Sequence, residues 1–192
     1  MNNFSFFNAF KSLISVILIN TIIIYSRINK KKIIFFYHPR ILLVGIHTFY
    51  VEDLLKEFRK SSVIIYGHND IKSLGKNYFF IKSGYLKLLL GVDIFMCTNM
   101  SDVVVKKSKK VFLTHHIYDS PLINFEKEKT LCMRFSKYNI VFLPSQDLIK
   151  LYNEMFARYN SFANIKKPTL IEIGYPKFDF LEKKINSIKS LK

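Results

Sequence analysis

Short, continuous apolar runs are the feature of this 192-residue sequence that most restricts its fold. The runs are rich in Ile, Val and Phe and do not alternate with polar residues, so a strand built from one of them has both faces buried. Such strands are typical of a parallel sheet flanked by helices. The predicted strands are residues 33–37, 41–45, 63–67, 78–81, 92–97, 111–114, 140–143 and 169–173.

Helical patterns lie between or after these strands. In one of them, Leu148, Leu151, Met155 and Tyr159 recur at helical spacing, and Ser145 precedes them as an N-cap. The alternation of strands and helices predicts a single Rossmann-like α/β domain with a parallel sheet over residues 30–192. The predicted helices are residues 50–60, 85–90, 126–138, 146–159 and 177–188.

An uncharged segment, residues 12–26, precedes this domain. As a helix it covers roughly 22 Å, and residues 4–10 extend it toward the ~30 Å of a bilayer's hydrocarbon core. Its polar residues are expected to point in scattered directions, which favours insertion into a membrane over lying flat on it. These residues are Ser12, Ser15, Asn20 and Thr21. Residues 1–29 are therefore predicted to be a membrane-associating helix, and a buried core helix is the alternative.

The charges that flank this helix predict its orientation. Arg27 and Lys30, Lys31 and Lys32 follow the apolar segment, whereas Lys11 alone precedes it. Basic residues remain on the cytoplasmic side, so we expect the following domain to lie at the cytoplasmic face of the cell membrane. No small-residue cleavage site follows the apolar segment, which argues against a cleaved signal peptide.

The formal net charge of +16 indicates a polyanionic partner, either nucleic acid, an anionic membrane or a phosphate-rich substrate. Part of this excess accompanies a joint enrichment in Lys, Ile, Asn, Phe and Tyr that is typical of AT-rich genomes, and a solvated lysine surface is the alternative. No RNA-binding aromatic motif or zinc finger supports nucleic acid as the partner.

The motifs that would identify several common classes are missing. No GxGxxG, GxxxxGK[ST] or GxSxG occurs, which argues against dinucleotide sites, P-loops and hydrolase elbows. Cys97 and Cys132 have no CxxC or Cys/His spacing, so we expect no metal site and two thiols buried in the core. No cofactor is predicted.

Histidine follows four of the predicted strands. In a parallel sheet, ligands bind beyond the carboxyl ends of the strands. This concentration therefore indicates a rim that handles phosphate or hydroxyl groups. The histidines are His38, His47, His68, His115 and His116.

Two motifs resemble the CDP-glycerol glycerophosphotransferase family. The stretch VFLTHHIYDSPL, residues 111–122, is similar to the family's strand followed by His-Gly-x-x-x-Lys-Pro. His115 falls on the family's histidine, and Asp119 and Pro121 fall on the Asp and Pro of its HGxSDKP variants. The sequence departs from the family motif at two positions. His116 stands where glycine is usual, and Ser120 stands where lysine is usual.

The second motif, IGYPKFD at residues 173–179, resembles the family's Gly-Tyr-Pro-Arg-x-Asp at the end of a strand. Lys177 replaces the usual Arg, and Asp179 is kept as the expected cap of the next helix. Between the two motifs, YNIVFLPSQ at residues 138–146 resembles a strand that ends in a small polar residue and opens a helix. The resemblance covers residues 100–182 well and the preceding part only in general layout.

The resemblance implies attack by an acceptor hydroxyl on the glycerol-bearing phosphate of CDP-glycerol, with release of CMP. His115 would be the catalytic base, for which a pKa near neutrality suits histidine. A histidine that only hydrogen-bonds the loop backbone is the alternative. His116, Asp119, Lys177, Arg40 and His38 are the candidate substrate-binding residues, and solvated bases are the alternative for Lys177 and Arg40.

The family's members polymerise or prime teichoic-acid-like polyol phosphates and have two Rossmann-like domains in the GT-B arrangement. The resemblance implies that this chain is the acceptor-side half. Its partners would be the membrane and a polyol-phosphate acceptor, with CDP-glycerol bound only through a second domain or chain. The alternatives are a non-catalytic membrane-tethered remnant that binds an anionic polymer, lipid surface or partner subunit, and a binder of nucleic acid or anionic lipid that acts by charge alone.

Overall fold

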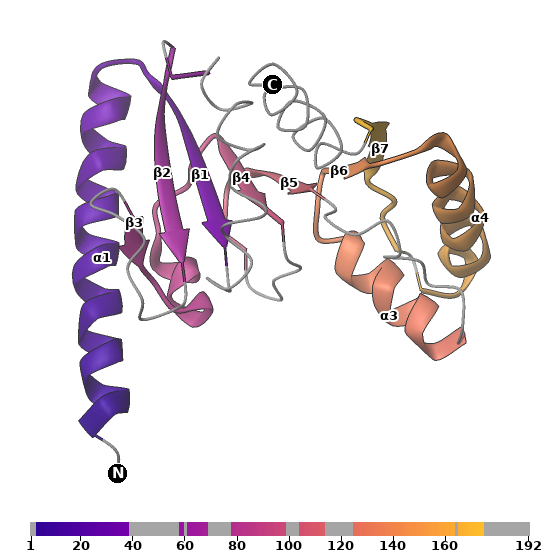
Figure 1. The fold of residues 1–192 in the computed structure, drawn as a ribbon, viewed down its shortest axis with the longest axis horizontal. Helices are drawn as coiled ribbons and strands as arrows, with labels where there is room; N and C mark the ends of the chain where they lie inside the picture. Colours follow the sequence, from indigo (N-terminus) through magenta and orange to yellow (C-terminus); the bar gives the residue numbers. More distant parts are fainter. Residues whose placement is uncertain are drawn as a thin grey trace, which may run out of the picture.

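A computed structural model describes residues 3–38, 58–59, 61–68, 78–98, 104–113, 125–163 and 165–174. Within these ranges a parallel sheet is covered by helices (Figure 1). The elements are α1 (Asn3–Ile28), β1 (Lys32–His38), β2 (Ser62–His68), β3 (Tyr78–Phe80), the 3-10 helix η2 (Ser83–Leu88), β4 (Ile94–Cys97), β5 (Lys109–Leu113), α3 (Phe125–Phe135), β6 (Ile140–Leu143), α4 (Gln146–Ala163) and β7 (Thr169–Glu172).

The seven strands lie in the order β3-β2-β1-β4-β5-β6-β7, and every neighbouring pair is parallel. The chain moves outward from β1 to β3 and then returns to place β4 on the other side of β1. The order therefore reverses between β1 and β4, as in a Rossmann-like sheet. The predicted α/β class is confirmed.

The predicted strands within the described ranges all form, with boundaries shifted by one or two residues. The predicted helix at 85–90 is the 3-10 helix η2, and the one at 126–138 ends earlier, at Phe135. Ser145 caps α4, since its hydroxyl accepts a hydrogen bond from the amide of Leu148 at 3.3 Å. The predicted elements at 41–45 and 177–188, and all but two residues of 50–60, lie outside the described residues.

Both faces of the sheet are buried, as its continuous apolar runs predicted. On one face the rings of Phe35, Tyr37 and Phe95 stack with centroids 6.0 to 6.4 Å apart. Helices α1, η2, α3 and α4 all contribute side chains to the core on this face. The opposite face has a second buried cluster, formed by Ile34, Phe36, Tyr66, Met96, Val111 and Leu113.

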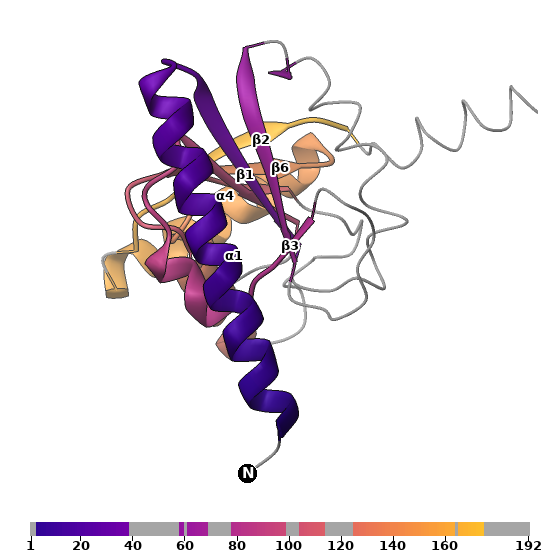
Figure 2. The ribbon, with the colours of Figure 1, turned by 90° about the vertical axis from the view of Figure 1, so that its left-hand side faces the viewer.

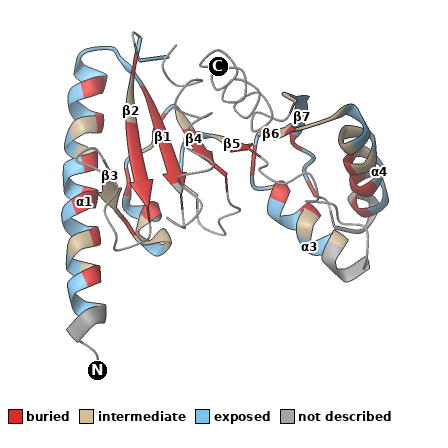
Figure 3. Cartoon of the chain, in the orientation of Figure 1, coloured by how far each residue is buried: buried red, intermediate tan, exposed pale blue. Residues whose placement is uncertain are grey.

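Helix α1 packs along this sheet and does not stand apart from it (Figure 2). Its buried residues recur at helical spacing and form one stripe, which faces the sheet (Figure 3). The stripe mixes apolar with small polar side chains: Asn8, Ser12, Ser15, Val16, Ile19, Ile23 and Ser26. Of the four polar residues that were expected to point in scattered directions, Ser12 and Ser15 face the sheet, Asn20 is half-buried and Thr21 is exposed.

The opposite side of α1 is apolar and exposed, and we call it the outer face. Helix α1 therefore carries apolar side chains on both sides, because Val16, Ile19 and Ile23 face the core as well. Helix α1 is therefore partly buried: one side packs on the core of the domain and the other side is exposed. The residues of the outer face are Phe6, Phe7, Phe10, Leu13, Ile14, Ile17, Leu18, Ile24, Tyr25 and Ile28.

Hydrogen bonds join α1 to the segment around η2. The Asn20 side chain donates to the carbonyl of Leu88 at 3.2 Å and accepts from the amide of Leu90 at 2.8 Å. The amide of Lys82 donates to the hydroxyl of Ser12 at 3.2 Å. Arg27 donates to the carbonyl of Gly91. These bonds are spread over four turns of α1, so they fix its rotation as well as its position.

Candidate functional site at the carboxyl edge of the sheet

The reversal of strand order places the expected ligand site between the ends of β1 and β4. These two strands are paired up to Tyr37 and Cys97, so His38 and Thr98 both follow at the same edge. The backbone of His38 is therefore where the sequence placed it, at the end of a strand beside the switch point. Its side chain lies outside the described part of the structure.

His68 ends β2, and its Cα is the register partner of His38. The His68 side chain is only 3% exposed, and its ring packs edge-on against Phe80 with centroids 5.9 Å apart. Its carbonyl accepts a hydrogen bond from the amide of Ile81 at 2.7 Å. The His68 imidazole lies inside the domain. It therefore does not contribute to the exposed rim of histidines that the sequence predicted.

Thr98 is a polar residue at the switch point that sequence reasoning did not select. Its side chain is 1% exposed, and its Oγ1 has no hydrogen-bond partner among the residues that the structure describes. A buried hydroxyl of this kind has a cost unless something satisfies it. The signal in the sequence was its position directly after the predicted strand 92–97. Thr98 is therefore a candidate contact for a bound ligand.

Tyr37 and Cys97, which precede His38 and Thr98, are both fully buried. The Tyr37 hydroxyl donates to the carbonyl of Ile81 at 3.3 Å. Burial raises the pKa of Tyr37, the nearby Cys97 raises it further, and a hydrogen bond with Ser83 lowers it. The phenol is therefore neutral at physiological pH. The Cys97 sulfur lies 3.3 Å from the hydroxyl of Tyr138, so this thiol is part of the core, as predicted.

The remaining predicted site residues fall outside the described ranges, namely His115, His116, Asp119, Lys177 and Arg40. The structure does describe the strands that lead to them. Strand β5 ends two residues before His115, and β7 ends five residues before Lys177. Only β6 separates these strands, which places their ends about 10 Å apart at a spacing of about 4.8 Å per strand.

Gly174, which opens the GYPKFD motif, has a φ of +69°. Side chains with a Cβ rarely adopt this left-handed conformation. A Cβ built on Gly174 would meet no atom within 4 Å, so the need for glycine is conformational and not steric. The backbone turns here as the chain leaves β7.

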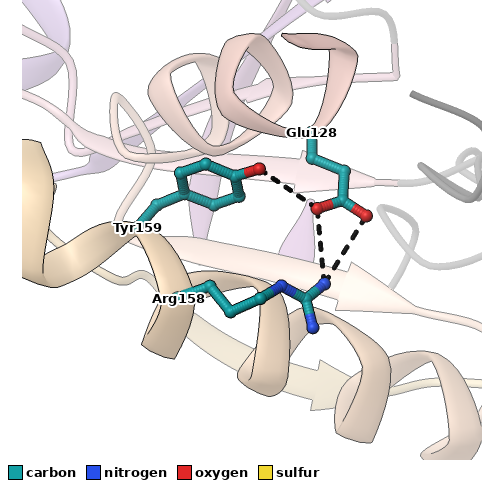
Figure 4. A network of polar contacts seen from close by, with 3 residues as sticks. All are labelled: Glu128, Arg158 and Tyr159. Carbon is teal, nitrogen blue, oxygen red and sulfur yellow. Dashed lines mark hydrogen bonds and ion pairs between the residues drawn. The ribbon is translucent and has the colours of Figure 1, made fainter. Parts of the chain in front are cut away.

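A second polar cluster joins α3 to α4 (Figure 4). Glu128 accepts hydrogen bonds from Arg158 at 3.3 Å and from the Tyr159 hydroxyl at 3.2 Å. Burial, followed by the carboxylate of Glu128, raises the pKa of Tyr159. The pKa of the nearby Cys132 is raised to about 11, chiefly by burial. The charge of Glu128 raises it further, and the charge of Arg158 lowers it. The cluster joins α3 to α4, and burial keeps the Cys132 thiol and the Tyr159 hydroxyl protonated at neutral pH.

Among the described residues, no three His, Cys, Asp or Glu side chains gather in a way that would hold a metal ion. Helix α1 is long and apolar enough to cross a membrane by length and composition. Comparison of the chain with protein-family models, with curated proteins and with solved structures finds no match.

Proposed function

We propose that this chain is a CDP-glycerol glycerophosphotransferase-like protein of polyol-phosphate polymer synthesis in the cell envelope, acting at the cytoplasmic face of the cell membrane. It would supply the acceptor side of the reaction. His115 would be the base that takes the proton of the acceptor hydroxyl. A second domain or chain would hold the nucleotide.

The observation that carries this proposal is the placement of the two resembling motifs on one sheet. Strands β5 and β7, which precede His115 and Lys177 in the sequence, end at the same carboxyl edge on either side of β6. Parallel strands deliver their following loops to one edge, where α/β proteins bind ligands. A base and a cation supplied from there would serve proton removal and charge stabilisation on one phosphate.

Two local features support the same assignment. Gly174 adopts a conformation that favours glycine, which gives a physical reason for the first residue of GYPKFD. Ser145 ends the stretch after β6 and caps α4, as the intervening YNIVFLPSQ segment requires. Each feature connects a residue of the resemblance to a specific backbone role.

The experiment is a reconstituted transfer assay. The full chain would be combined with labelled CDP-glycerol, a polyol-phosphate acceptor and a separately expressed nucleotide-binding domain of a glycerophosphotransferase. We expect label in the polymer and release of CMP only when both proteins are present, since the donor phosphate must be held for proximity catalysis. No transfer in the combined reaction, with both proteins folded, would contradict the proposal.

A further inference from the structure

The outer face of α1 carries ten exposed apolar side chains and has no partner among the residues that the structure describes. It runs for about 34 Å along the helix, from Phe6 to Ile28, at 1.5 Å per residue. Ile17 is 65% exposed and Ile28 is 74% exposed. A soluble monomer rarely exposes a continuous apolar surface of this extent, so the face needs a partner.

The apolar surface continues from α1 onto the segment around η2. Asn20 holds the backbone of Leu88 and Leu90, and both leucine side chains are exposed. Ile17 and Ile24 lie one turn before and one turn after Asn20, on the same side of the helix. The helix and the η2 segment therefore present one apolar face, although they are about 70 residues apart in the sequence.

The charged side chains of α1 and of residues 81–90 are all basic. No Asp or Glu occurs before Glu52, and none occurs between residues 78 and 92. Lys11 lies with its Nζ 4.4 Å from the centre of the Phe7 ring, and exposed Lys30 and Lys87 lie at the end of α1 and beside Leu88. A basic border around an apolar face is complementary to an anionic lipid surface.

The hydrogen bonds of α1 argue against a helix that crosses the bilayer. A spanning helix is surrounded by lipid, and every polar backbone group near it must be satisfied. Here the amides of Lys82 and Leu90 are satisfied by Ser12 and Asn20 of α1. Insertion of the helix would break these bonds or draw the domain into the hydrocarbon.

We infer that α1 stays docked on the domain and binds an anionic bilayer through its outer face, lying in the plane of the membrane interface. The side that carries Val16, Ile19, Ile23 and the buried serines packs on the protein, and the outer face contacts the lipid. A second copy of the chain is disfavoured as the occupant, because two such faces would bring their basic borders together. This inference deepens the membrane attachment proposed above and is independent of the transfer chemistry.

The test uses the full 192-residue chain and sealed vesicles of phosphatidylcholine with or without about one third phosphatidylglycerol. We expect binding to the anionic vesicles to be at least about tenfold tighter, because each basic residue near the surface adds to the attraction. Ile17→Glu with Ile24→Glu should weaken binding by about tenfold or more, because charge is inserted into the contact. Met133→Glu, at an exposed position of α3, should leave binding unchanged.

Topology is read from an epitope tag added at the amino terminus. Docked α1 leaves the tag outside the sealed vesicles, where added protease removes it, whereas a spanning helix protects it. The inference is overturned by a protected tag, by equal affinity for neutral and anionic vesicles, or by a soluble dimer that the double glutamate variant dissociates. Circular dichroism verifies that this variant is folded, and the wild-type results on lipid charge and tag cleavage do not depend on it. Vesicle binding without any transfer activity would refute the proposed function alone.

Discussion

His38 and His68 are register partners at the ends of the adjacent parallel strands β1 and β2. Both residues lie at the same edge of the sheet: His38 is on β1, beside the point where the strand order reverses, and His68 is one strand away from it. His68 is buried against Phe80 and braces this edge from within. His68 therefore does not belong to an exposed rim, which corrects the expectation at this one position.

The first prediction concerns His115. His115→Ala should lower the transfer rate in the reconstituted assay by about 10²–10⁴-fold, the usual range for removal of a general base. His116→Ala is the matched control and should cost much less, because this position is glycine in the resembling family. Initial rates with labelled CDP-glycerol measure both variants. Equal and small losses for the two would rule out His115 as the base and favour a non-catalytic binding module.

The second prediction concerns the strength of membrane attachment. Wild-type protein should sediment with cell membranes and remain there in 1 M salt. Salt screens the basic border but not the burial of apolar side chains such as Ile17 and Ile24. Immunoblots of pellet and supernatant give the result. Complete release by salt would show that charge alone holds the protein on the membrane.

The third prediction concerns the contact between α3 and α4. Glu128→Ala should lower the free energy of unfolding by about 1–3 kcal/mol, because it removes the acceptor for Arg158 and for the Tyr159 hydroxyl. Lys150→Ala is the control, since its ion pair with Asp147 is fully on the surface and should contribute less than about 0.5 kcal/mol. Urea denaturation measures both. Equal losses would mean that the Glu128 cluster is no stronger than a surface pair.

The fourth prediction concerns Gly67, next to His68 in β2. A Cβ at this position would lie 2.5 Å from Cζ of Phe35, so Gly67→Ala must displace a ring at the centre of the core. We expect a loss of about 1–3 kcal/mol in the free energy of unfolding, as for other overpacked cores. Gly84→Ala, where a Cβ meets nothing within 4 Å, should be close to neutral. A neutral Gly67→Ala would show that the Phe35 ring moves freely.

The fifth prediction is a pH dependence of stability. Burial raises the pKa of Cys132 from 9.0 to about 11, so the folded chain holds this proton more tightly than the unfolded chain does. Its contribution is complete below pH 9 and is lost as the pH rises toward 11. Stability should fall across this interval, and the fall should be smaller in Cys132→Ala. Denaturation curves between pH 8 and 11 measure the difference, and identical slopes would contradict the assignment.

The strands were predictable because continuous apolar runs, such as residues 33–37 and 140–143, indicate strands that are buried on both faces. Which side of α1 faces the sheet was not predictable in this way. Ser12, Ser15 and Asn20 look like interruptions of an apolar helix, and their role depends on Lys82, Leu88 and Leu90, which are distant in sequence. Local periodicity does not contain contacts of this kind.

For the candidate site, the sequence predicted only which residues lie at the ends of strands. The sequence placed His38 and His68 after β1 and β2, and both assignments are confirmed. It did not indicate that His68 would be buried, since that depends on Phe80 in the neighbouring strand. Thr98 was missed because a single threonine after a strand has no pattern. The roles of His115, His116, Asp119, Lys177 and Arg40 stay predictions.

The bond between Asn20 and the backbone of Leu90 also sets an order of events during synthesis. The helix leaves the ribosome first, and its docking partner follows 70 residues later. At about 5–20 residues per second, this interval is about 4–14 seconds. During this interval the backbone groups that hydrogen-bond with Asn20 have not yet been synthesised. Slower translation through residues 20–90 therefore lengthens the time for which α1 cannot yet dock on its own domain.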